Sequence, residues 1–206
     1  MKHLPNILTG GRLVLTLFMF VALASAAGAG PWRADDIPVD LQFALQRWAF
    51  WAFAVAAITD FFDGWLARRM HAESIWGAIL DPIGDKVLVC GAVLGLLALG
   101  PQPMVVLPAG LILFREFTVS ALREVGAGRG IKLPVTTLAK WKTTLQLTAL
   151  ALELFVAAWA AFGLPDDPTV QGPVTAAAHG LFWLAAVVTI VTGAQYWEQT
   201  RRALEP

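Results

Sequence analysis

Four aspartates lie in stretches of the sequence that are otherwise almost uncharged. Asp60 and Asp63 are three positions apart, and Asp81 and Asp85 are four positions apart. On a helix, each of these spacings places both side chains on one face. Charged side chains are rare and costly inside membrane helices, where they usually face a polar cavity that serves a function. The two pairs therefore predict a functional site at which four carboxylates converge.

The chemistry that four neighbouring carboxylates support best is the binding of a divalent metal. In one cleft of low dielectric they would repel one another and take up protons unless cations compensated their charge. Hard oxygen ligands select Mg²⁺, Mn²⁺ or Ca²⁺ over zinc. The structural alternative is a set of salt bridges between these aspartates and the nearby cations Arg68, Arg69, Lys86 and Arg115.

The elements that must position these carboxylates are predicted to be membrane helices. Of the 206 residues, 57% are hydrophobic and 15% charged, and the mean hydropathy is +0.64, whereas a soluble domain carries roughly 25% charged residues. Uncharged runs at 13–32 and 168–197 are long enough to cross a hydrocarbon core of about 30 Å. A third run, 87–114, is interrupted by Gly100-Pro101-Gln102-Pro103, which predicts a turn between two helices.

We therefore predict an all-α integral membrane protein with six transmembrane helices in a single domain over residues 1–206. The helices are expected at about residues 8–28, 47–69, 74–99, 104–124, 138–162 and 174–197. Asp60 precedes Arg68 by 8 residues, which corresponds to about 12 Å of helix. The carboxylates are thus expected at a shallow depth, in a polar cleft that faces the cytoplasm.

The distribution of Lys and Arg orients this bundle, because cytoplasmic loops and helix ends accumulate these residues. With the N-terminus inside, the outer segments carry only Arg33 and Arg47. The cytoplasmic side then carries Lys2, Arg12, Arg68, Arg69, Arg123, Arg129, Lys132, Lys140, Lys142, Arg201 and Arg202. We predict a multi-pass protein of the inner (cytoplasmic) membrane with both termini in the cytoplasm. The competing interpretation of the first span is a signal peptide cleaved near Ala24-Ser25-Ala26.

Overall charge and cysteine content exclude several other classes of protein. The 15 Lys and Arg residues balance 15 Asp and Glu residues, so no basic face points to a nucleic-acid partner. The single cysteine, Cys90, excludes an internal disulfide and a thiolate zinc site, and it is interpreted as a small buried apolar side chain. A metal-ion transporter and a noncatalytic membrane scaffold remain as alternative function classes.

Residues 60–85 resemble a family signature. The pattern Asp60-x2-Asp63-Gly64-x2-Ala67-Arg68-x8-Gly77-x3-Asp81-x3-Asp85 is similar to that of the CDP-alcohol phosphatidyltransferases, with all eight fixed positions present across 26 residues. Pro5-Asn6-x2-Thr9-x2-Arg12 resembles the start of that family's first membrane helix. The segments around Arg115 and Lys140 resemble the bacterial phosphatidylglycerophosphate synthase branch of the family.

This resemblance implies a six-helix membrane enzyme, usually a homodimer, that transfers a phosphatidyl group from CDP-diacylglycerol to an alcohol and releases CMP. It implies that two Mg²⁺ or Mn²⁺ ions are bound by Asp60, Asp63, Asp81 and Asp85, and that Asp85 is also the catalytic base. It further implies that CDP-diacylglycerol is bound by Asp60, Gly64, Ala67, Arg68, Gly77, Asn6, Thr9 and Arg12.

Basic residues on the fourth and fifth predicted helices bear on the identity of the acceptor. Arg115 lies about two turns inside Arg123, so its charge needs a partner such as Asp81, Glu116 or a substrate phosphate. We expect the acceptor to be glycerol 3-phosphate, with its phosphate bound by Arg115, Arg123, Lys140 and Lys142. The alternatives are another acceptor, such as inositol phosphate or serine, and basic residues that serve only topology and attraction to anionic lipids.

Overall fold

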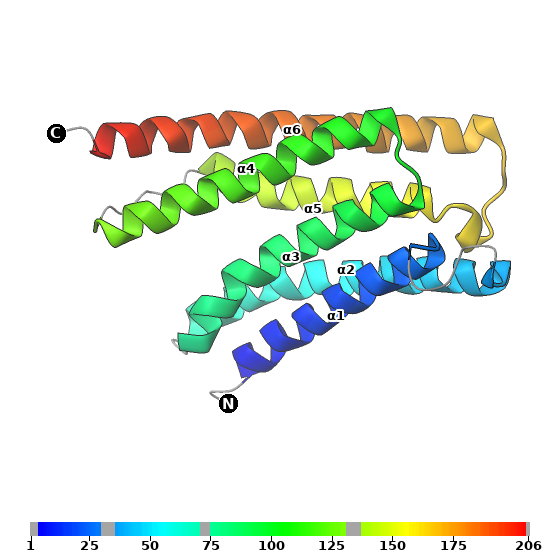
Figure 1. Cartoon of the computed structure of the whole chain (residues 1–206), viewed down its shortest axis with the longest axis horizontal. Helices are drawn as coiled ribbons and strands as arrows, with labels where there is room; N and C mark the ends of the chain where they lie inside the picture. Colours follow the sequence, from blue (N-terminus) through cyan, green and yellow to red (C-terminus); the bar gives the residue numbers. More distant parts are fainter. Residues whose placement is uncertain (1–3, 30–35, 71–74, 131–136, 205–206) are drawn as a thin grey trace.

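The computed structural model describes the backbone of residues 4–29, 36–70, 75–130 and 137–204. Side chains are described in the same ranges except at 4–8, 61–70, 75–79, 81, 82, 137–140 and 204. Within these ranges the secondary structure is helical, and six long helices run back and forth along one direction (Figure 1). They are α1 (Leu4–Ala26), α2 (Val39–Met70), α3 (Ile75–Leu99), α4 (Pro103–Gly128), α5 (Thr137–Ala157) and α6 (Pro168–Leu204), with the short 3₁₀-helix η2 (Ala160–Phe162) before α6. The all-α, six-helix architecture is therefore confirmed.

Several of these helices have the length and apolar composition required to cross a membrane. Among the described residues, such spans are Thr9–Ala26, Val39–Asp60, Pro103–Gly128 and Pro168–Ala203. Large apolar side chains on their outer faces are exposed, including Leu17, Trp48 and Phe114. An apolar surface of this extent is suited to lipid rather than to water, so the chain is a multi-pass membrane protein.

The turn predicted between the third and fourth helices lies where the sequence placed it. α3 ends at Leu99 and α4 begins at Pro103. Gln102 has an extended backbone, and its carbonyl oxygen accepts hydrogen bonds from the backbone N–H groups of Val105 and Val106 at 2.9 and 3.0 Å. The two prolines allow this arrangement, since proline has no N–H to continue a preceding helix and its ring fits the first helical turn.

Other helix boundaries differ from the predicted ones. α2 begins at Val39 rather than near residue 47, and α6 extends beyond 174–197 in both directions. The predictions were limited to the length of the hydrocarbon core, whereas a helix can continue into water on either side. The fifth predicted helix, 138–162, is divided into α5 and η2. Cys90, expected to be buried, is only partly so, because it lies on α3 between the core-facing and outer sides of the helix.

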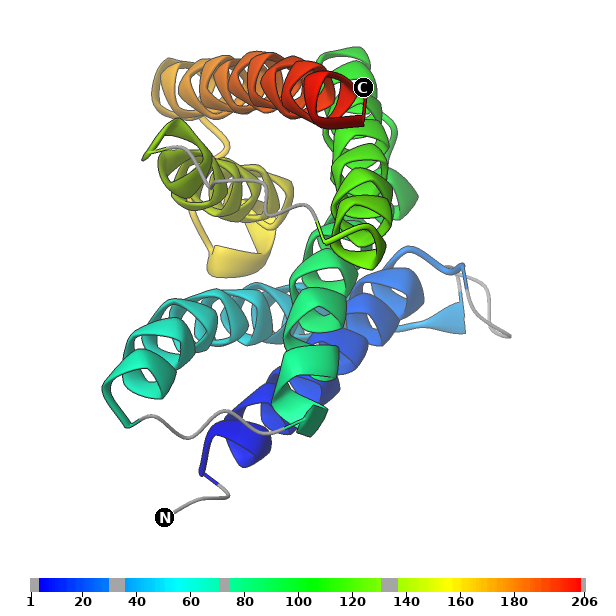
Figure 2. The same ribbon diagram turned by 90° about the vertical axis from the view of Figure 1, so that its left-hand side faces the viewer.

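The six helices form two groups of three (Figure 2). α1 packs against α2 and α3, whereas α6 packs against α4 and α5, and α3 joins the groups through contacts with α4 and α5. Fully buried apolar side chains fill the space between the helices. Each helix from α2 to α6 contributes a large one to this core: Phe53, Leu88, Ile112, Leu150 and Phe182, in that order. This division matters for function because each group supplies one wall of the cavity described below.

Both ends of the chain lie at one end of the bundle (Figure 1), which we name the terminal end. α6 starts at the opposite end, where Asp167 caps it. The hydroxyl and backbone N–H of Thr169 each donate a hydrogen bond to Asp167 Oδ1 at 2.8 Å, and they lower the pKa of this carboxyl. At that same opposite end, Arg47 donates a 2.6 Å hydrogen bond to the carbonyl oxygen of Ala161 and so ties α2 to η2.

Candidate active site

Arg12 connects the first three helices toward the terminal end. It lies on α1 and is only 2% exposed. Its Nη1 forms ion pairs with Asp60 on α2 and with Asp85 on α3, the latter at 3.1 Å. One guanidinium therefore compensates two carboxylates that the sequence separates by 25 positions. Carboxylate oxygens from two different helices thus meet at one cationic group.

Gly84 provides the space that Arg12 occupies. A Cβ atom at this position would lie 2.7 Å from Nη2 and 2.9 Å from Nε of Arg12. The guanidinium therefore rests against the bare backbone of α3 immediately before Asp85. The absence of a side chain at Gly84 allows Arg12 to reach both carboxylates at once.

Arg115 lies on α4 in the other group of helices and is buried against α6. Its Nε donates to the carbonyl oxygen of Thr189 at 3.1 Å, and its Nη2 donates to Thr192 Oγ1 at 3.2 Å. Its Nη1 pairs with Glu116 Oε1 at 3.3 Å. The stem packs on Gly193, where a Cβ would lie 2.8 Å from Arg115 Cγ. A buried charge within a membrane helix needs such partners, and here α6 supplies most of them.

Glu116 holds two cations together. Its Oε1 forms an ion pair with Lys142 on α5 as well as with Arg115. Lys142 is buried, and Glu116 is partly buried. Glu116 is one of the partners that the sequence suggested for Arg115, whereas the side chain of Asp81, another of them, lies outside the described residues. A single carboxylate between two cations leaves this wall of the bundle with surplus positive charge.

Tyr196, on α6, holds the third cation of this wall. Arg123 Nη2 donates a 2.8 Å hydrogen bond to the Tyr196 hydroxyl, and the Arg123 guanidinium lies 4.8 Å from the centre of the ring. The Arg115 guanidinium lies 5.8 Å from the same ring. Tyr196 is 1% exposed, so the ring is a fixed surface between two arginines, and its electron-rich faces attract both.

A polar cavity of about 130 Å³ joins the two walls. The acidic side chains of the first group and the basic side chains of the second group line the same space. Its lining consists of Asp60, Asp85, Leu88, Val89, Arg115, Glu116, Arg123, Lys142, Thr143, Gln146 and Leu147. The cavity therefore offers carboxylates for a cation or a proton on one side, and cations for an anionic group on the other.

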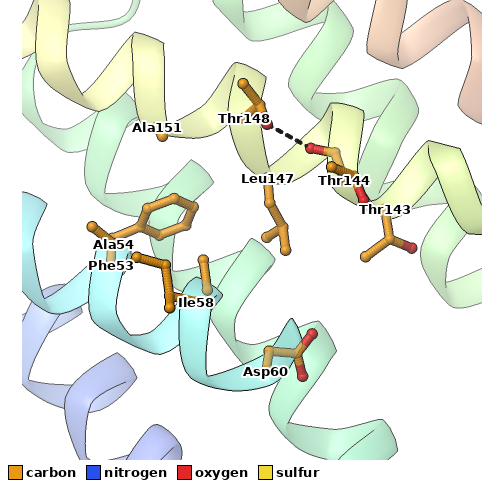
Figure 3. A pocket seen from close by; sticks show the side chains of 10 residues that line it. Phe53, Ala54, Ile58, Asp60, Thr143, Thr144, Leu147, Thr148 and Ala151 are labelled. Atoms are coloured by element: carbon orange, nitrogen blue, oxygen red, sulfur yellow. Dashed lines mark hydrogen bonds between the residues drawn. The ribbon is translucent and has the colours of Figure 1, made fainter. Parts of the chain in front are cut away.

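An apolar groove of about 410 Å³ adjoins this cavity between α2 and α5. Figure 3 shows Phe53, Ala54 and Ile58 of α2 opposite Thr144, Leu147, Thr148 and Ala151 of α5, with Asp60 toward one end. The Thr148 hydroxyl donates to the Thr144 carbonyl oxygen at 2.8 Å, so this hydroxyl is satisfied within α5 (Figure 3). Asp60, Thr143 and Leu147 line both spaces, so the groove and the cavity are adjacent.

Residues 2–193 match the family model of the CDP-alcohol phosphatidyltransferases. The chain belongs to this family. A protein of Cereibacter sphaeroides is 35% identical over 98% of this chain and 95% of its own length. Proteins of Rickettsia bellii and Escherichia coli K12 are each 34% identical over 98% of this chain and 97% of their own lengths. All three relatives are named CDP-diacylglycerol–glycerol-3-phosphate 3-phosphatidyltransferase.

Several candidate site residues lie outside the described side chains, namely Asn6, Asp63, Gly64, Ala67, Arg68, Gly77, Asp81 and Lys140. The backbone places Asp63 on α2 with Asp60, and Asp81 on α3 with Asp85. Among the side chains that are described, no three potential metal ligands form a cluster. Of the cations considered as structural partners for the aspartates, Lys86 donates to the Ser120 hydroxyl, and Arg115 pairs with Glu116. Asp60 and Asp85 pair with Arg12, and the side chains of Arg68 and Arg69 lie outside the described residues.

Sequence reasoning missed the part that α6 plays in this phosphatidyltransferase. It treated the last span as generic, whereas Thr189, Thr192 and Tyr196 support the two arginines of α4. Two signals were present in the sequence. The spacing of these three residues places them on one helix face, and Tyr196 is the single tyrosine of the chain. Neither signal identifies the partner helix, because that depends on how α4 and α6 pack.

Proposed function

We propose that this chain transfers the phosphatidyl group of CDP-diacylglycerol to sn-glycerol 3-phosphate and so forms phosphatidylglycerophosphate and CMP. The observation that carries this proposal is the polar cavity, in which carboxylates and a surplus of cations face the same space. Family membership and the names of the relatives support it. Because the α4 and α5 wall presents three cations and one carboxylate, it suits an acceptor that carries a phosphate better than serine, which carries none.

In the proposed reaction, the primary hydroxyl of glycerol 3-phosphate attacks the phosphorus that bears the diacylglycerol. The bond from this phosphorus to the CMP oxygen breaks, and CMP leaves. Asp85 takes the proton of the attacking hydroxyl. We assign Arg12, which pairs with Asp60 and Asp85, to contact with the pyrophosphate. We assign the rest of the donor site, by family resemblance, to Asn6, Thr9, Gly64, Ala67, Arg68 and Gly77.

We also propose that two Mg²⁺ or Mn²⁺ ions are bound by Asp60, Asp63, Asp81 and Asp85. The convergence of Asp60 and Asp85 on one guanidinium supports this, since hard oxygen donors that share a cation also suit a divalent ion. When bound, such ions neutralise pyrophosphate charge and stabilise the departing CMP.

The apolar groove suits a fatty acyl chain of the lipid donor. Its lining is mainly apolar, and Asp60 is one of the residues that line it. A diacylglycerol chain lying in it would bring the attached phosphate to the polar cavity, where the two spaces meet at Thr143 and Leu147. The lipid donor and the water-soluble acceptor would thus meet where the apolar groove adjoins the polar cavity.

The direct test is an assay of the purified protein with labelled CDP-diacylglycerol, Mg²⁺ and one acceptor at a time. We expect CMP release with glycerol 3-phosphate to exceed release with inositol phosphate, serine or choline. Equal turnover with a neutral alcohol would reject the acceptor and leave only the shared phosphatidyl-transfer step. Ion flux in vesicles without CMP release would instead indicate a transporter.

Loss of a single cation should weaken the acceptor site selectively. Charge-assisted hydrogen bonds to phosphate contribute roughly 1.5–3 kcal/mol each, so Arg123→Ala and Lys142→Ala should each lower kcat/KM for glycerol 3-phosphate about tenfold to a hundredfold. The KM for CDP-diacylglycerol should change little. Arg129→Ala is the matched control, because Arg129 is an exposed cation at the C-terminal end of the same helix as Arg123. Unchanged kinetics in both variants would remove these residues from the acceptor site.

We place the protein in the cytoplasmic membrane as a homodimer with the terminal end in the cytoplasm. In a Cys90→Ala background, single cysteines at Asp36 or Asp166 should react with an impermeant thiol reagent added outside the cell. Cysteines at Arg129 or Arg202, at the terminal end, should react only after permeabilisation. Asp166 is preferred to Asp167, which caps α6. External labelling at Arg129 would invert this topology, and a mature N-terminus near Ala27 would support a signal peptide.

A further inference from the structure

Gln146 is a buried polar side chain that has no role in the reaction proposed for this chain. It lies on α5, one turn after Lys142, so the two residues share a helix face. It is 2% exposed and lines the polar cavity. Within the part of the chain that the structure describes, its Oε1 atom has no hydrogen-bond partner. Buried polar atoms nearly always have one, so this amide is suited to a group that enters the cavity.

The neighbours of Gln146 restrict what that group can be. Arg115, Arg123 and Lys142 attract an anion, and Asp60 and Asp85 attract a cation or a donor proton. Gln146 is the neutral amide among the lining residues, and it can both donate and accept hydrogen bonds. A hydroxyl group also donates and accepts, so it pairs with either end of the amide. An uncharged hydroxyl is therefore the natural partner of Gln146.

Glycerol 3-phosphate carries one group more than the proposed chemistry uses. Its phosphate is directed to the cations, and its reacting primary hydroxyl is directed to Asp85. The secondary hydroxyl on the middle carbon remains, and it would be buried when the acceptor fills a cavity of about 130 Å³. We propose that Gln146 hydrogen-bonds this secondary hydroxyl and thereby makes the enzyme select acceptors that carry it. This inference rests on the proposed function and deepens it.

The proposal is tested by removing the hydrogen bond from each side in turn. The enzyme variant is Gln146→Met, which has a similar length and no amide, and the substrate variant is propane-1,3-diol monophosphate, which lacks the middle hydroxyl. Wild-type protein should prefer glycerol 3-phosphate to this analogue by about tenfold to a hundredfold in kcat/KM. In Gln146→Met the preference should fall to within about threefold of unity, while kcat/KM for the analogue stays close to the wild-type value.

The matched control is Gln195→Leu, which removes an exposed glutamine amide from the outside of α6 and should keep the full preference. Gln146→Leu provides a second apolar variant if Gln146→Met does not purify as a folded protein. A wild-type preference that persists in the folded Gln146 variant would overturn the assignment of Gln146, as would a wild-type enzyme that does not distinguish the two acceptors. Wild-type protein that releases no CMP with glycerol 3-phosphate would instead reject the proposed function.

Discussion

Asp85→Asn should lower the rate of CMP release by about a thousandfold, because the amide cannot take the proton of the attacking hydroxyl and general-base catalysis contributes roughly 10²–10⁴-fold. The substitution keeps the size and shape of the side chain. Binding of CDP-diacylglycerol should therefore persist, and equilibrium binding of the labelled lipid measures this separately from turnover. Asp85 is suited to meet a substrate hydroxyl because its side chain is 53% exposed although it pairs with buried Arg12.

Two comparisons make this result specific. Asp60→Asn should raise the Mg²⁺ concentration needed for half-maximal activity, and added metal should recover part of its rate, since we assign Asp60 to metal and donor binding and not to proton transfer. Asp166→Asn changes an exposed acid at the end of the bundle opposite the termini and should leave the kinetics unchanged. Wild-type turnover by Asp85→Asn at saturating Mg²⁺ would remove Asp85 from the mechanism.

Gly84→Ala should lower kcat/KM by about a hundredfold, with a smaller effect on thermal stability. The new Cβ would lie 2.7 Å from Arg12 Nη2, so the guanidinium must move. It ends a flexible side chain and can move at little steric cost, but it would then leave Asp60 and Asp85. Loss of both ion pairs should raise the activation free energy by about 3 kcal/mol, which corresponds to roughly a hundredfold lower rate.

The control for this prediction is Gly110→Ala on α4, where an added Cβ has no atom within 4 Å. This variant should match wild type in both activity and melting temperature. A Gly84→Ala enzyme with full activity would show that the position of Arg12 does not matter for turnover. A variant that fails to fold would be replaced by Arg12→Lys, which keeps the charge but can reach only one carboxylate closely.

The fold could be predicted from the sequence because its main signals are local. Uncharged runs predicted helices, and Gly100-Pro101-Gln102-Pro103 predicted the turn between α3 and α4, which is observed. Helix ends beyond the hydrocarbon core were predicted poorly. α2 begins earlier than expected because a sequence that includes Asp40 and Arg47 can remain helical in water.

The candidate site could be predicted only in part, because its residue types are visible in the sequence but its pairings are not. Asp60, Asp85 and the cations of α4 and α5 were singled out by charge in an apolar context. The bridge made by Arg12 depends on the crossing of three helices. The ion pair between Lys142 and Glu116 depends on how α4 and α5 both pack against α6. Gln146 carries no charge, so only the cavity around it shows that it lacks a partner.

The support that α6 gives to Arg115 has a consequence for how the protein is made. During synthesis the ribosome completes α4 before α6, so Arg115 enters the lipid while Thr189, Thr192 and Tyr196 are still untranslated. An arginine without these partners is costly in a bilayer, and arrival of the final segment relieves that cost. A nascent chain with five helices would contain every acid of the signature and still lack an assembled acceptor wall. If Arg115 and Arg123 bind the acceptor as proposed, their site is completed only when α6 joins the bundle.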